Sequence, residues 1–230
     1  MTVRMQGRTA GLFYLGVVLA GIFALAYGPG QLIEVRDPAA TLANLQARPG
    51  LFHAMIAAGF GMNLFFAPLP FLLARFMSAH GPRAAKLMIA LALASIPFTL
   101  IAFYNYAGLA GAVSAGSASA ETVQEARAGY RFWLHGAIFF WGVWLAPYGW
   151  LVFKSGAIPR WLGVMLMLGA VSYMIDLFGS LAIDNFYDLP LTGQITLPAS
   201  IGEIGSCLWL VVFGARESAP QPAAPASEAA

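Results

Sequence analysis

The segment of residues 161–183, WLGVMLMLGAVSYMIDLFGSLAI, decides the fold class of this chain. It is apolar over almost its whole length and carries one acid, Asp176, in its second half. A helix needs about 20 apolar residues to cross the ~30 Å hydrocarbon core of a bilayer. The segment is long enough to do so, and it therefore predicts a transmembrane helix.

Five other segments have the same length and character, namely residues 9–29, 51–76, 85–111, 132–153 and 197–215. The connections between them hold the helix breakers and charges, as in SAHGPRA (78–84) and KSGAIPR (154–160). We therefore expect an all-α integral membrane protein whose six transmembrane helices form one bundle over residues 1–215. The Ala-, Pro- and Ser-rich residues 216–230 are expected to form a disordered cytoplasmic tail.

The composition agrees with a protein dissolved in lipid. Of the 230 residues, 60% are hydrophobic and 10% are charged, whereas soluble domains carry about 25% charged residues. The net charge of +2 is small and dispersed, so there is no basic stripe of the kind that binds nucleic acid. The single cysteine, Cys207, excludes an internal disulfide and a cysteine-rich metal module.

The distribution of Lys and Arg predicts the orientation, because cytoplasmic loops carry an excess of these residues. Eight lie on the side of the two termini and four on the opposite side: Arg4, Arg8, Arg75, Arg83, Lys86, Lys154, Arg160 and Arg216 against Arg36, Arg48, Arg127 and Arg131. Both termini are thus expected in the cytoplasm. The first span could instead be a cleaved signal peptide, with ALA (24–26) as the cleavage site, but cleavage would leave an odd five spans.

Five polar residues from five spans are predicted to share the outer half of the membrane. At ~1.5 Å per residue, Asp176 lies roughly 10 Å and Glu203 about 9 Å from the outer ends of their helices. His53, Asn105 and His135 fall near the outer ends of the second, third and fourth spans. With Tyr173 added from the helical face of Asp176, the candidate pocket comprises six residues: His53, Asn105, His135, Tyr173, Asp176 and Glu203.

The faces around the two acids favour an inward orientation. Asp176 shares its face with Gly169 and Ser172, and Glu203 shares its face with Ala199 and Ser200. Small residues let transmembrane helices approach closely, so these faces are expected to contact other helices. The opposite face of the fifth span is expected to face lipid and carries Met167, Met174 and Leu181.

Simpler interpretations stand beside the pocket. His53 and His135 can be boundary residues, Asn105 can be an interhelical hydrogen-bond donor, and the tryptophans can belong to the interface belt or to packing. The two acids can likewise be structural hydrogen bonders. They are harder to explain in this way, because a carboxyl at mid-membrane costs ~2.5–3.5 kcal/mol on insertion scales.

No local motif identifies a reaction. The chain has no Walker-type loop, no H-E-x-x-H and no G-x-S-x-G elbow. Two histidines and two carboxylates can ligate zinc, and two histidines can ligate haem, but each of these residues comes from a different helix. We therefore predict no metal site, and neither a cofactor nor catalytic residues can be assigned.

The last three spans resemble a known family. The residues that carry the resemblance are FFWGVWLAPYGWLVFKSGAIPRWLGVMLMLGAVSYMIDLFG (139–179) and LPASIGEIGSCLWLVVFG (197–214), together with RTAGLFYLGVVLAGIFA (8–24). They are similar to the bacterial membrane family catalogued as domain of unknown function 4386. His135, Asp176 and Glu203 fall where that family is expected to carry such residues. The resemblance implies six helices in a bacterial inner membrane and is silent on chemistry.

Three classes of function remain open from the sequence. The first is a binding or transport protein whose partners are the lipid bilayer and a small-molecule or lipid ligand. The second is an accessory or structural subunit that binds a partner membrane protein and whose polar belt locks the helices together. The third is an intramembrane enzyme that uses a metal or acid–base chemistry.

Overall fold

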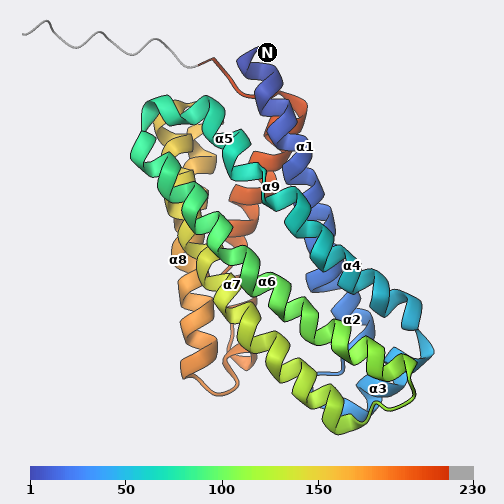
Figure 1. Cartoon of the computed structure of the whole chain (residues 1–230). Coiled ribbons are helices and arrows are strands. Elements are labelled where there is room, and N and C mark those ends of the chain that lie inside the picture. The colour runs from blue at the N-terminus through green and yellow to red at the C-terminus, as the bar shows by residue number, and fades with distance from the viewer. Residues whose placement is uncertain (218–230) are drawn as a thin grey trace, which may run out of the picture.

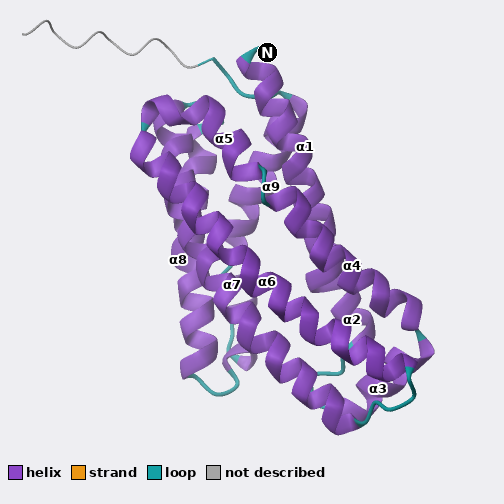
Figure 2. Ribbon diagram, in the orientation of Figure 1, coloured by secondary structure: helices purple, strands orange, loops and turns teal. Residues whose placement is uncertain are grey.

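The computed structural model describes residues 1–217, and residues 218–230, most of the predicted tail, lie outside the described residues. The described part is built of helices and contains no strand (Figures 1 and 2). Six of its helical stretches are long and apolar enough to cross a membrane. The predicted all-α fold with six transmembrane helices is confirmed, and the chain is a multi-pass membrane protein.

The first span is one continuous helical stretch with a change of winding in it. It comprises α1 (Val3–Gly21), the π-helical η1 (Ile22–Tyr27) and α2 (Gly28–Leu32). Its start is set by Thr2, whose side chain accepts a hydrogen bond from the Met5 N–H at 3.3 Å. Short π-helical turns inside α-helices are frequent at functional sites, which draws attention to the surroundings of η1.

The second span is interrupted near its middle. It is preceded by the short helix α3 (Pro38–Ala47) and consists of α4 (Pro49–Phe66) and α5 (Leu69–Met77), with the 3-10 turn η2 (Ser78–His80) at its end. The break falls beside two prolines, Pro68 and Pro70, which lack the N–H that a continuing helix needs. The proline pair thus accounts for the break in this span.

The third and fourth spans form a long hairpin, α6 (Pro82–Ser114) and α7 (Ala120–Ser155). At ~1.5 Å per residue each helix is roughly 50 Å long, which exceeds the ~30 Å hydrocarbon core. The hairpin therefore extends beyond the core, and α3 packs against its projecting end (Figure 1). We refer to this end of the molecule as the α3 end.

The last two spans are α8 (Arg160–Ala182) and α9 (Leu197–Val212), joined through the 3-10 turns η3 (Phe186–Asp188) and η4 (Thr192–Gln194). α9 returns alongside α1, and Arg4 Nε and Arg8 Nη2 donate hydrogen bonds to the carbonyl oxygens of Phe213 (3.1 Å) and Val212 (3.0 Å). The N-terminus and the end of α9 therefore lie at the same end of the molecule, opposite the α3 end (Figure 1).

Glycines set the distance between α7, α8 and α9. A Cβ atom built on Gly163 of α8 would lie 2.7 Å from the carbonyl oxygen of Gly149 on α7, and one on Gly169 would lie 2.7 Å from Ala199 Cα on α9. The small residues thus form helix contacts, as the sequence predicted. The lipid-facing assignment of Met167 and Met174 is wrong, because their side chains pack against Gly149 and Gly142 of α7.

Two apolar cores fill the bundle. The first extends from the end of the termini to mid-bundle and includes residues of every span, whereas the second lies toward the α3 end and includes Phe52, Phe103 and Tyr130. No residue of α8 or α9 belongs to the second core. Toward the α3 end, the bundle therefore has a large lobe, formed by spans one to four with α3, and a small lobe, formed by α8, α9 and their connection (Figure 1).

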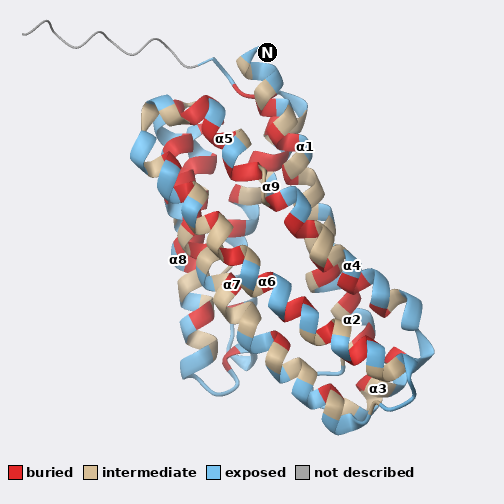
Figure 3. Ribbon diagram, in the orientation of Figure 1, coloured by how far each residue is buried: buried red, intermediate tan, exposed pale blue. Residues whose placement is uncertain are grey.

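Buried residues face the inside of the bundle, and exposed residues lie on its outer surface (Figure 3). Exposed large apolar side chains occur along the length of several spans, for example Leu19, Leu64, Phe71, Val171 and Phe178. A soluble protein of this size rarely exposes such extended apolar surface. The surface therefore agrees with burial in lipid.

Candidate functional site

A cavity of about 220 Å³ lies at the middle of the bundle. Its walls come from the first span, α4, α7, α8 and α9, and they include Val18, Met62, Trp141, Tyr173 and Ile204. Each of these residues lies close to the midpoint of its span. The cavity is therefore at mid-depth in the membrane-spanning region, whereas the sequence predicted the pocket in the outer half of the membrane.

Glu203 is the one acidic residue that lines this cavity. It reaches the wall because α9 lies close against α8, where a Cβ on Gly202 would be 2.8 Å from the backbone nitrogen of Leu166. Tyr173 Oη, from α8, donates a hydrogen bond to Glu203 Oε2 at 3.4 Å. No Lys, Arg or His lines the cavity, and the ion pair found among residues 1–217 does not involve Glu203.

Buried hydroxyl groups surround Glu203 without hydrogen-bond partners. Tyr14 Oη, Tyr148 Oη and Ser206 Oγ are buried and have no partner within the described residues. Most buried polar atoms in proteins are hydrogen-bonded, so these groups call for an explanation. Tyr14, which is 2% exposed, lines the cavity itself, whereas its hydroxyl oxygen is covered by the atoms around it.

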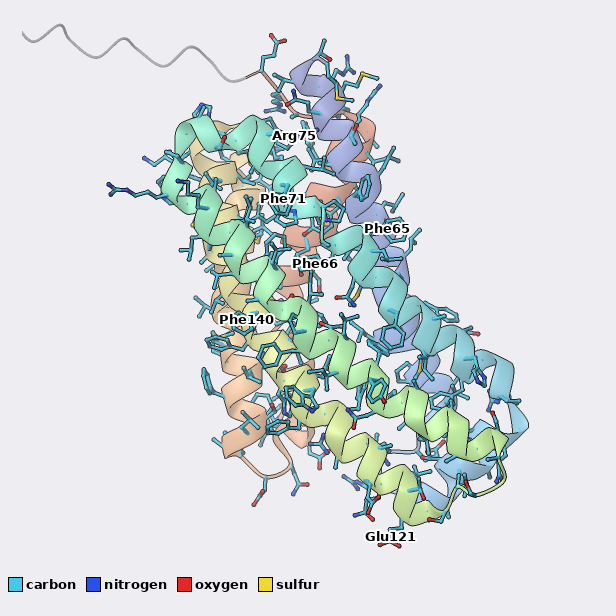
Figure 4. The ribbon with its side chains drawn as sticks, in the orientation of Figure 1. Phe65, Phe66, Phe71, Arg75, Glu121 and Phe140 are labelled. Carbon is cyan, nitrogen blue, oxygen red and sulfur yellow. The ribbon has the colours of Figure 1, made fainter. Side chains whose placement is uncertain are left out.

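Aromatic rings form one side of the remaining wall. Phe66 of α4 contacts Trp144 edge to face, with ring centroids 5.4 Å apart, and Trp144 is stacked on Tyr148 at 5.2 Å. Trp141 and Tyr14 complete this side. Figure 4 shows Phe66 toward the middle of the molecule and Glu121 at the far α3 end of α7. The packed rings fix the shape of the cavity.

The cavity reaches the surface between the first and last spans. Ile22 of η1 and Ile204 of α9 line it and are also 52% and 40% exposed. Toward the termini the same two spans are in close contact, because a Cβ on Gly11 would lie 2.6 Å from the backbone nitrogen of Val211. The opening therefore lies on the side of the α3 end, beside the π-helical turn.

The structure brings two of the six predicted site residues, Tyr173 and Glu203, together in the cavity. Asp176 lies outside it, where Tyr187 Oη donates a hydrogen bond to Asp176 Oδ2 at 3.3 Å. His135 of α7 is within electrostatic range of Asp176. These three residues form a second polar group near the small lobe.

The other two predicted residues are bonded within their own helices. His53 is exposed, and its Nδ1 is 2.8 Å from the Pro49 carbonyl oxygen. Asn105 Nδ2 donates to the Ile101 carbonyl oxygen at 2.8 Å, and its side chain packs against Gly129 of α7. Neither lines the cavity.

The sequence-based interpretation did not include Tyr14, Trp141, Trp144 and Ser200, which line the cavity. Their depth in the membrane could have identified two of them. Tyr and Trp gather at membrane interfaces, whereas Tyr14 and Trp141 lie in the interior of their spans.

Residues 1–217 contain no group of three or more His, Cys, Asp or Glu side chains placed to hold a metal ion.

A model of the family described as domain of unknown function (DUF4386) matches residues 9–214. The chain belongs to this family. The DUF4386 chain is also similar to an uncharacterized protein of Archaeoglobus fulgidus, with 34% identity over 86 residues, which cover 36% of this chain and 46% of the relative. The match thus spans less than half of that relative. No solved structure matches the DUF4386 chain.

Proposed function

We propose that this DUF4386 protein binds a small, mostly apolar molecule with one polar group in the cavity at mid-membrane. The observation that carries the proposal is Glu203, which lines a cavity of about 220 Å³ together with its hydrogen-bond donor Tyr173. The apolar wall would hold the apolar part of the ligand, and Glu203 with Tyr173 would hold its polar part.

The polar groups of the wall also support a ligand. A carboxyl removed from water with a single hydrogen-bond donor is unfavourable, because most of its hydrogen-bonding capacity is unused. A molecule that fills the cavity and pairs with this carboxyl would stabilise the folded state, because ligands that bind only the folded state stabilise it.

The proposed route of entry is lateral. The opening beside Ile22 and Ile204 lies at the depth of the lipid chains, so a molecule dissolved in the bilayer would reach the cavity without crossing a polar surface. We place the protein in the inner membrane of a bacterium with both termini in the cytoplasm. This placement is supported by the eight Lys and Arg residues on the side of the termini.

The test is native mass spectrometry of the full chain, released from membranes in a mild detergent. Wild-type protein is expected to carry a bound mass. In Glu203→Gln the affinity should fall about tenfold or more, because a hydrogen bond to a charged group contributes about 1.5–3 kcal/mol, and the occupancy should fall with it.

Asp176→Asn is the matched comparison, since Asp176 is an acid on the neighbouring helix that does not line the cavity. This variant should keep the bound mass. A wild-type protein that carries no bound mass, or equal occupancy in Glu203→Gln and wild type, would contradict the proposal.

A further inference from the structure

We propose that the ligand of this cavity is a small organic cation, of the quaternary ammonium or protonated alkylamine type, whose charge pairs with Glu203. The inference rests on the proposed function and adds the chemical class of the ligand to it. It follows from the charge, the aromatic composition and the size of the cavity.

The charge of the cavity favours a cation. Glu203 has no basic partner in the wall, and its hydrogen-bond donor, Tyr173, is neutral. A carboxylate removed from water needs an opposite charge or several hydrogen bonds. A ligand cation would supply the opposite charge, whereas an anion would be repelled and a neutral ligand would leave Glu203 unpaired.

The aromatic rings favour the same class of ligand. Tyr14, Phe66, Trp141, Trp144 and Tyr173 all line the cavity that Glu203 closes. The negative face of an aromatic ring attracts a cation, most strongly for tryptophan and more strongly where water is excluded. Aromatic cages are a common protein solution for quaternary ammonium groups. A cavity lined by five aromatic residues and one carboxyl has the groups that such a cation needs.

The size of the cavity suits a small cationic group. An engineered cavity of ~150 Å³ holds benzene, and pockets for drug-sized ligands measure about 300–1,000 Å³. At about 220 Å³, this cavity lies between the two. Tetraethylammonium, which is somewhat larger than benzene, is therefore a suitable probe. Its neutral isostere 3,3-diethylpentane has the same shape with carbon in place of nitrogen.

The experiment compares the two probes on detergent-purified full-length protein by isothermal titration calorimetry. Tryptophan fluorescence serves as a second readout, because Trp141 and Trp144 line the cavity. Wild-type protein should bind tetraethylammonium at least about tenfold more tightly than 3,3-diethylpentane. Glu203→Gln should lose most of this preference, because it keeps the shape of the side chain and removes the charge, while the aromatic rings remain.

Two further variants control the result. Tyr173→Phe keeps the ring and should weaken binding of the cation by no more than about threefold. Glu125→Gln, an exposed acid at the α3 end of α7, should bind both probes as wild type does. If Glu203→Gln does not fold, the two probes on wild-type protein still decide the question.

Other outcomes overturn the inference in distinguishable ways. Equal binding of the two probes to wild type would exclude recognition of the charge but leave the cavity as a binding site. A preference for the cation that is undiminished in Glu203→Gln would exclude the pairing with Glu203. Binding of neither probe would overturn the cation inference, and the mass retained in native mass spectrometry would then decide the proposed function separately.

Discussion

Tyr14 shows at the scale of one residue how the site differs from ordinary packing. Its ring belongs to the first apolar core and lies 6.4 Å from the ring of Tyr148. Its hydroxyl is buried and has no partner among the described residues. Phenylalanine would fill the same space without this hydroxyl, so packing alone does not explain a tyrosine at this position.

Tyr14→Phe should therefore separate stability from binding. An unpaired buried hydroxyl is unfavourable by about 1–3 kcal/mol, so the melting temperature of the variant should equal or exceed that of wild type. Ligand occupancy should fall at the same time. Thermal unfolding in detergent and native mass spectrometry measure the two effects.

Tyr148→Phe is the control for this prediction. Tyr148 also carries a buried hydroxyl without a partner, but it does not line the cavity. The variant should keep both its stability and its ligand. A fall of several degrees in the melting temperature of Tyr14→Phe would show instead that its hydroxyl is a structural hydrogen-bond donor.

The residues of the candidate site were predictable only in part. An acid inside an apolar segment is conspicuous, so the sequence singled out both Glu203 and Asp176. Their depths were estimated from helix ends, and depth alone does not distinguish a residue that lines the cavity from one that bonds to Tyr187 in a loop. The tyrosine of the first span was missed because its neighbours on α8 and α9 are distant in sequence.

Among the helices, the fourth shows what hydropathy does and does not predict. It was expected from residue 132, but α7 begins at Ala120, where Ser119 and Thr122 form a reciprocal capping box. The first turns of α7, AETVQEARAG, are polar. Hydropathy therefore identified the stretch that can lie in lipid, whereas the helix continues beyond it toward the α3 end.

The crossing of α7 and α8 gives a prediction at the scale of elements. Gly163→Ala would place a Cβ 2.7 Å from the Gly149 carbonyl oxygen and 2.9 Å from the Phe153 backbone nitrogen. Backbone atoms cannot move away without separating the two helices. The free energy of unfolding should therefore fall by about 1–3 kcal/mol, as measured by thermal unfolding in detergent.

Gly108→Ala makes the same chemical change at an exposed position of α6. A Cβ there has no atom within 4 Å, and alanine favours a helix over glycine by roughly 0.5–1 kcal/mol. This variant should be as stable as wild type or slightly more so. Equal losses in the two variants would mean that the close crossing of α7 and α8 does not limit stability.

The whole molecule places both described ends of the chain on one side, and the proposed orientation assigns that side to the cytoplasm. Single cysteines test this assignment. Glu121→Cys at the α3 end should react with a membrane-impermeant maleimide in intact cells, whereas Arg83→Cys near the termini should react only after the membrane is permeabilised. Both positions are exposed. The opposite labelling pattern would reverse the orientation.

Wild-type protein provides the background for this experiment. Its single cysteine, Cys207, is 1% exposed. The Cys207 Sγ lies 3.9 Å from the carbonyl oxygen of Gly11 on α1. It should remain unlabelled in intact and permeabilised cells. Labelling of the new cysteines can therefore be measured without replacing Cys207.

The number of spans was predictable from sequence, but their arrangement was not. Each span is long and apolar enough to be recognised alone. In lipid, however, the face that packs on another helix is no more apolar than the face that contacts the bilayer. The assignment of Met167 and Met174 to lipid failed for this reason, and the division into two lobes could not be anticipated.

One ion pair joins these two lobes at the α3 end. Arg36 Nη2, beside α3, lies 3.4 Å from Asp188 Oδ2 in the connection between α8 and α9, and both side chains are exposed. Exposed pairs of this kind contribute about 0–1 kcal/mol, and salt screens them. Dissolved ions therefore weaken this link, so the ionic strength of the surrounding medium changes the contact between the lobes by no more than this small amount.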